Sequence, residues 1–258
     1  MPEYVNEMTP LERDLSIFQK LELDKQPVGV KFLFAEPQGI ARLDKKLGLC
    51  EMIPEAQSGE VFYAGLEDHV CAGPVPLGMV ELDPFYHSGQ IGPCLEVFKE
   101  ARANRRIYEV LPTLKKGTCN YTAFAPLDKL TFNPDVIVLT GRARKMEIVL
   151  RSVSWTTGQM YESKGTPVVG CAWTLVYPYL SGKINFSVTG LTFGHIAREV
   201  GTEGNVTVSV PWDCLPTMLE NLQEMKWVLP AYEDGRDNYT KRFDRVTGAT
   251  EGWPSDDA

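Results

Sequence analysis

Residues 135–140 (DVIVLT) constrain the fold more than any other stretch of the chain. Their continuous apolar character and β-branched content are typical of a strand that is covered on both faces. Gly141 follows, and residues 142–152 then carry apolar side chains at helical spacing. A strand, a glycine turn and a helix in this order predict a sheet with helices packed against it.

Other segments show the periodicity of regular structure. Residues 28–34 (VGVKFLF) are rich in β-branched and aromatic residues, and residues 205–210 (NVTVSV) alternate apolar with polar residues. Both patterns are typical of strands. Residues 9–21 and 214–226 repeat apolar residues at helical spacing, which predicts a helix in each.

These elements fit one domain. Residues 166–177 and 183–189 flank a turn, and they form either two strands or a helix that leads into a strand. We expect an α+β fold, with a mixed sheet and helices packed on it, in a single compact domain at residues 1–230. The polar residues 231–258 predict an extended or partly disordered tail.

Composition excludes several classes of protein. With 43% hydrophobic residues, a chain of 258 residues can bury a substantial core. Lys and Arg number 26 against 34 Asp and Glu, so the net charge of -8 argues against a nucleic-acid partner. No apolar run approaches the roughly 20 residues that a membrane helix needs. The polar, acidic beginning of the chain does not resemble a signal peptide, so we expect a cytoplasmic protein.

Residues 48–78 are the best candidate for a functional site. This stretch contains two of the six cysteines, one of the three histidines and many glycines and prolines. Cysteines in a reducing compartment stay as thiols or act as ligands, and their wide spacing is not that of a disulfide scaffold. The stretch indicates where a site lies and does not name a reaction.

Short motifs spread over residues 27–225 resemble the uncharacterised prokaryotic family called domain of unknown function 169. The motifs are PVGVKF at 27–32, AQSGE at 56–60, CAG at 71–73, PDVIVL at 134–139, YLSGK at 179–183 and VSVP at 208–211. The resemblance matches family cysteines to Cys50, Cys71 and Cys171. Relatives carry another cysteine and an arginine near residues 187–190, and this chain has neither there. The family itself implies no established activity.

A metal or iron–sulfur site built from Cys50, Cys71 and Cys171 is the sharpest hypothesis. Thiolate sulfur is a good ligand for zinc, copper(I) and the iron of clusters, and such centres use about four ligands. His69, Cys94 or Cys119 could complete the set. The chain has no Cys-x-x-Cys motif, so only the fold can bring these residues together. The alternative for each cysteine is a buried thiol that packs as a small apolar residue.

His69 and Cys71 lie two residues apart. On a strand they would share one face, so both could reach one metal ion or a haem iron. In a loop that argument does not hold, and the histidine would then be a surface or hydrogen-bonding residue. Haem and zinc therefore stand beside an iron–sulfur cluster as candidate cofactors.

Residues 189–195 (TGLTFGH) form a third candidate site, with Gly190, Gly194 and His195 as its binding residues. A strand ends and a helix begins here, and the N–H groups at a helix start can bind a carboxylate or a phosphate. The glycines match neither a Walker loop nor a dinucleotide-binding motif. A tight turn is the alternative interpretation.

The leading functional hypothesis is a metal- or cluster-binding protein with a redox or reductive role and a redox partner or small-molecule ligand. One alternative is a non-catalytic module that binds a small molecule or a partner and whose cysteines belong to the core. Another is a cofactor-free hydrolase or lyase that uses His69 or His195. A homo-oligomer is compatible with all three.

Overall fold

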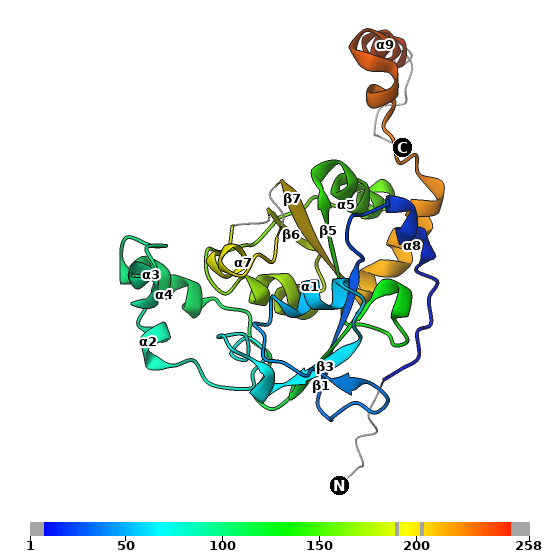
Figure 1. Ribbon diagram of the computed structural model, residues 1–258. Helices are drawn as coiled ribbons and strands as arrows, with labels where there is room; N and C mark the ends of the chain where they lie inside the picture. Colours follow the sequence, from blue (N-terminus) through cyan, green and yellow to red (C-terminus); the bar gives the residue numbers. More distant parts are fainter. Residues whose placement is uncertain (1–7, 189–190, 202–203, 249–258) are drawn as a thin grey trace, which may run out of the picture. The chain divides into compact units, whose positions relative to one another are not determined.

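A mixed sheet forms the centre of the structure (Figure 1). The computed structural model describes residues 8–188, 191–201 and 204–248. The strands in these residues are β1 (Val28–Leu33), β2 (Ala41–Arg42), β3 (Phe62–Gly65), β4 (Tyr121–Pro126), β5 (Val136–Arg142), β6 (Asn185–Val188) and β7 (Asn205–Pro211). Their order across the sheet is β2-β3-β4-β1-β5-β7-β6. The pair β2–β3 is parallel and the other pairs are antiparallel.

Helices lie around the sheet. The α-helices are α1 (Met52–Gln57), α2 (Pro84–His87), α3 (Ile91–Cys94), α4 (Ala101–Glu109), α5 (Ala143–Thr157), α6 (Tyr177–Ser181), α7 (Phe193–Ala197), α8 (Leu215–Glu224) and α9 (Pro230–Gly248). The short 3-10 helices are η1 (Ser16–Leu21), η2 (Leu66–Asp68), η3 (Leu127–Lys129) and η5 (Trp212–Cys214), and η4 (Ala172–Val176) is a π-helix. Figure 1 shows the segment with α2, α3 and α4 extending to one side of the sheet. The expected α+β class is therefore confirmed.

One face of the sheet is covered by α1 and η4. Val30 on β1 lies opposite Phe124 on β4 and Val136 on β5, and all three side chains are fully buried. Together with Met52 of α1 and Leu175 of η4 they belong to one apolar cluster. This cluster also contains Cys171, so one of the predicted cysteine ligands is part of the core of the fold.

The opposite face is covered by α5, which also contacts α8. Successive residues of a strand point to opposite faces, so Ile137 and Leu139 of β5 lie on this side. Helix α5 packs against β5 and β7. Asn221 of α8 donates hydrogen bonds to the carbonyl of Ser152 at 2.6 Å and to Oγ1 of Thr156 at 2.8 Å on α5. The continuous apolar pattern of residues 135–140 reflects this burial on both faces.

Two expected elements differ from the sequence prediction. Of residues 9–21, Ser16–Leu21 forms a 3-10 helix, so the predicted helix is much shorter than expected. Residues 166–177 were compatible with a strand or a helix, and the structure has the helices η4 and α6, followed by β6. An all-apolar helix that is buried against a sheet lacks an amphipathic pattern, so its sequence resembles that of a buried strand.

The chain divides into two compact units, Met1–Gln223 and Glu224–Ala258. In the second unit the polar sequence predicted an extended tail, whereas the structure has α9, with non-helical backbone angles at Gly235. Residues 249–258 of the predicted tail lie outside the described residues. None of the described helices is long and apolar enough to cross a membrane.

Replacing Phe124 tests the assignment of the core. Phe124 is fully buried and stacks on Phe62 with the ring centroids 5.3 Å apart. Phe124→Ala should lower the free energy of unfolding by about 3–5 kcal/mol, because it leaves a cavity between the sheet and its covering helices. Phe34→Ala is the matched control, since Phe34 is 53% exposed and its loss should cost less than about 1 kcal/mol. Equal losses of stability in urea titrations would contradict this assignment.

Candidate functional site

One cavity of about 270 Å³ brings the three predicted cysteines together. Its volume is slightly below the usual range for ligand pockets. Five separate segments form its wall, and the polar or aromatic residues among them are Cys50, Cys71, Tyr86, Tyr108, Cys171, Thr192, Phe193, His195 and Arg198. The convergence of Cys50, Cys71 and Cys171 on one cavity is the arrangement that the hypothesis of a cysteine site requires.

Backbone pairing places Cys50 beside Cys71. The N–H of Leu47 donates to the carbonyl of Asp68 at 2.9 Å, and the N–H of Val70 donates to the carbonyl of Leu47 at 3.1 Å. The segment before Cys50 therefore runs alongside the segment before Cys71. As a result, the N–H of Leu49 points at Sγ of Cys71, 3.4 Å away.

Cys71 accepts a second hydrogen bond, from the N–H of Gly73 at 3.2 Å. A side chain at position 73 would collide with Leu49, so a glycine allows the two segments to approach closely. Two N–H groups that donate to one sulfur atom stabilise negative charge on that sulfur. Hydrogen bonds of this kind to cysteine sulfur are one of the features that tune iron–sulfur centres.

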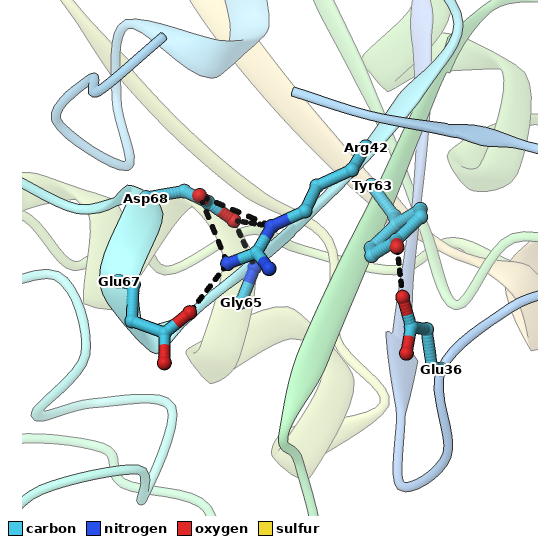
Figure 2. Close-up of polar contacts among 6 residues, drawn as sticks. All are labelled: Glu36, Arg42, Tyr63, Gly65, Glu67 and Asp68. Atoms are coloured by element: carbon cyan, nitrogen blue, oxygen red, sulfur yellow. Dashed lines mark hydrogen bonds and ion pairs between the residues drawn. The ribbon is translucent and has the colours of Figure 1, made fainter. Parts of the chain in front are cut away.

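An ion-pair cluster fixes the segment that leads to Cys71 (Figure 2). Asp68 is 8% exposed and accepts hydrogen bonds from the N–H of Gly65 at 2.7 Å and from Nε of Arg42 at 3.0 Å. Arg42 also contacts Glu67 through Nη2 at 2.7 Å. The hydrogen bonds to Asp68 and Glu67 raise the pKa of Arg42. The hydroxyl of Tyr63 donates to Glu36 on the neighbouring loop. These contacts hold η2 on the end of β3, directly before His69 and Cys71.

The third cysteine follows a strained turn. Val169 has φ of 52°, a left-handed conformation that is rare for a β-branched residue, and it lines the cavity. A side chain at Gly170 would overlap Thr192. Cys171 comes next and directly precedes the π-helix η4, an element that is frequent at functional sites. Strained backbone of this kind costs about 1–3 kcal/mol and is concentrated at functional sites.

The cysteines influence one another electrostatically. Burial, followed by the charge of Cys71, raises the pKa of Cys50 to about 12, and the positive charge of Arg198 opposes this shift. Burial and the charges of Cys71 and Cys50 raise the pKa of Cys171 well above its usual value. Cys50 and Cys171 are therefore neutral thiols at neutral pH unless a cation lies beside them.

Residues of the third candidate site also reach the cavity. Gly194 and His195 on α7 both line it, and Gly190 lies outside the described residues. Nε2 of His195 is buried, and none of the residues that the structure describes forms a hydrogen bond with it. Burial, together with the positive charge of Arg198, lowers the pKa of His195, so its imidazole is neutral at pH 7. The site predicted at residues 189–195 and the cysteine site are therefore parts of one cavity.

The other proposed ligands lie elsewhere. His69 forms an isolated bridge with Leu47 and is not one of the described residues that line the cavity, so the shared strand face with Cys71 is not observed. Cys94 is exposed on α3, whereas Cys119 is buried and its Sγ donates to the carbonyl of Tyr121 at 3.3 Å. Neither of them lines the cavity.

Arg198 is a cavity-lining side chain that the sequence did not predict. Its Nε lies 3.2 Å from Oε2 of Glu51, which also accepts a hydrogen bond from the N–H of Gly48 at 2.5 Å. This ion pair joins α7 to the loop of Cys50 across nearly 150 residues of sequence. Tyr86 and Tyr108, whose rings contact edge to face at 6.3 Å, were missed as well. No local pattern distinguishes these residues from ordinary helix residues.

The described residues contain no preformed metal site. No group of three or more His, Cys, Asp or Glu side chains among them is arranged to hold a metal ion. A zinc ion bonds sulfur at about 2.3 Å, so its cysteine sulfurs lie within about 4 Å of one another. A [4Fe–4S] cluster bonds each of its cysteines to a different iron atom, whereas a [2Fe–2S] cluster bonds two ligands to each iron.

Comparison with known proteins places the chain in a family. The family called domain of unknown function 169, described as an uncharacterised ArCR, matches residues 16–221. The chain belongs to this family. It is also 27% identical over 165 residues to the uncharacterized protein MJ0308 of Methanocaldococcus jannaschii, a match that covers 62% of this chain and 70% of that protein. No solved structure matches the chain. The predicted membership of this family is thereby confirmed, and neither the family description nor the name of the relative gives an activity.

Asp68 should stabilise the fold much more than Glu67, although both contact Arg42. Asp68→Ala removes a buried carboxylate with charge-assisted hydrogen bonds and should lower the free energy of unfolding by about 2 kcal/mol. Glu67→Ala removes a side chain that is 79% exposed and should cost less than about 1 kcal/mol. Urea denaturation of the two variants checks the difference. Indistinguishable midpoints would show that the cluster does not fix this segment.

His69 should make the protein less stable in weak acid. Burial lowers its pKa to about 4, against 6.5 for the unfolded chain, so the unfolded state binds a proton first as the pH falls. The stability that depends on neutral His69 is complete above pH 6.5, and up to roughly 3 kcal/mol is lost by pH 4. His69→Gln should reduce this loss when unfolding is measured between pH 4 and pH 8. Parallel pH profiles for both proteins would contradict the prediction.

Proposed function

We propose that this chain carries an iron–sulfur cluster held by Cys50, Cys71 and Cys171 and acts in electron transfer or in the reduction of a small molecule. The observation that supports the proposal most is that three cysteines, separated by up to 121 positions in the sequence, line one cavity. Cysteine thiolates are the usual ligands of such clusters.

The ligand chemistry of the site agrees with an iron–sulfur cluster. Three cysteines line one small cavity, and thiolate sulfur is a good ligand for cluster iron. Zinc, which cysteine thiolates also bind, and haem stand as the alternative cofactors.

The protein residues have separate parts in this proposal. A bound cluster supplies one-electron chemistry. Cys50 and Cys171 are buried, which keeps water from the ligands. The N–H groups of Leu49 and Gly73 donate to the sulfur of Cys71, and Arg198 places a positive charge near Cys50. Cys50, Cys71 and Cys171 would hold the cluster as thiolates, so their thiol protons would be released when it is bound.

The rest of the cavity is suited to a small, largely apolar ligand. Tyr86, Ile91, Leu95 and Tyr108 line it from the segment that carries α2, α3 and α4. Pockets for small molecules typically combine an apolar wall with a few polar groups. In this cavity those polar groups include Arg198, which would orient an anionic end of a ligand or of a redox partner.

The same cavity supports a second candidate function, that of a small-molecule-binding module without a cluster. In that case Cys50 and Cys171 would serve as buried apolar residues, as their location in or beside the core permits. The two candidates differ in one property, because only the first requires iron and sulfide in the protein. A hydrolase or lyase that uses His195 stays a prediction from the sequence.

Serine substitutions test the cluster proposal. After reconstitution with iron and sulfide without oxygen, Cys50→Ser, Cys71→Ser and Cys171→Ser should each lose most of the visible absorbance, because serine replaces a thiolate ligand. Cys94→Ser and Cys214→Ser are matched controls outside the cavity and should retain it. Circular dichroism shows whether each variant is folded. Equal absorbance in folded cavity variants and controls would contradict the proposal and support the module without a cluster.

A further inference from the structure

Residues 83–113 form a helical extension that leaves the fold and returns to it at one place. Just before and just after it, the N–H of Gly117 donates to the carbonyl of Gly78 at 3.4 Å, and the N–H of Leu114 donates to the carbonyl of Pro76 at 2.8 Å. The outgoing and returning chains therefore lie side by side. Figure 1 shows the extension, with α2, α3 and α4, reaching to one side of the sheet.

Contacts within the extension hold its helices together. Asn104 of α4 is fully buried, and its side-chain amide donates to the carbonyl of Gly89 at 3.0 Å. A side chain at Gly89 would collide with the backbone at Ala101, and one at Gly92 would collide with Asn104. The turn between α2 and α3, together with the start of α3, is thus packed closely against α4. The three helices form one unit.

The extension is not anchored to the rest of the fold by polar contacts. In the part of the chain that the structure describes, no hydrogen bond or ion pair joins residues 83–113 to a residue outside them. Instead, Tyr86, Ile91, Leu95 and Tyr108 line the cavity from this side. Contact between apolar surfaces is non-directional, so the extension can separate from the opposite wall without losing a hydrogen bond.

The connections on both sides of the helices are able to bend. Residues 79–82 and 110–113 contain neither helix nor strand. Hinges are usually a few residues in loops or at the ends of elements that absorb a change in backbone angles. The paired backbone at Gly78 and Gly117 stays on the side of the fold, and both glycines have left-handed angles, with φ of 69° and 76°.

We propose that the extension is a hinged cap, which opens to admit a small, largely apolar ligand to the cavity and closes over it. Tyr86, Ile91 and Leu95 are only partly buried, so a ligand that fills the cavity removes more of their apolar surface from water and favours the closed position. The inference rests on the part of the proposed function in which the cavity takes a small molecule, and it does not depend on a cluster.

Distances between spin labels test the hinge on the full chain. The chain has six cysteines, so the labels are attached to p-acetylphenylalanine at exposed positions. One pair joins the cap to the rest of the fold, at Arg102, whose side chain is 87% exposed, and at Trp155 on α5. The control pair, Phe34 and Trp155, lies outside the cap. Two populations of distances are expected for the first pair and one for the control.

The substitution Leu95→Ser tests whether the cap controls entry to the cavity. Loss of this apolar contact should shift the cap pair towards the longer distance. In protein freed of iron with a chelator, it should raise the rate at which iodoacetamide modifies Cys71 roughly tenfold, because the open position is more populated. Val110→Ser is the matched control, since Val110 is 65% exposed on the cap and does not line the cavity. It should change neither measurement.

Each of three results would overturn the cap. The first is a single narrow distance for the cap pair in both the unmodified chain and Leu95→Ser. The second is a longer distance in Leu95→Ser without faster modification of Cys71. The third is faster modification without a longer distance, which would mean that the substitution only widened a rigid wall. None of these measurements needs a cluster, so failure of the cap leaves the cluster proposal intact, and a protein that binds no iron contradicts the cluster alone.

Discussion

The candidate site depends on the pairing of the segment at Leu47 with the segment at His69 and Val70. Two backbone hydrogen bonds at Leu47 align these segments, which approach their cysteines from different parts of the chain. Asp68 holds one of the segments on the end of β3 through Gly65 and Arg42. If this pairing were lost, Cys50 and Cys71 would no longer face one cavity. The position of the first two cysteines is therefore a consequence of the sheet and of the backbone hydrogen bonds at its edge.

The third cysteine is placed differently, by packing and strain. Val169 adopts a left-handed conformation and Gly170 lies against Thr192, so the turn before Cys171 fits tightly beside α7. Helix η4 then packs the residues after Cys171 into the main apolar cluster. The favourable packing of the core therefore also offsets the strain of the turn before Cys171. This coupling explains how the strained turn before Cys171 persists next to a tightly packed interior.

The sequence predicted the elements whose patterns are local. The strands β1, β5 and β7 were recognised because a run of continuous or alternating apolar residues indicates which faces of a strand are buried. The cysteines of the cavity were identified through the family resemblance. Arg198 was not identified, because its ion pair with Glu51 forms only when segments that are distant in the sequence fold together. For the same reason His195 was assigned to a separate site, although the structure places it in the cavity of the cysteines.

The iron and acid-labile sulfide content of the unmodified protein, purified without oxygen, tests the central claim most directly. The account predicts iron and sulfide in matching amounts, with a broad absorption band in the visible region. Well-folded protein that contains neither, and that stays colourless after incubation with iron and sulfide, would contradict it. The cavity would then be that of a small-molecule-binding module whose cysteines belong to its wall.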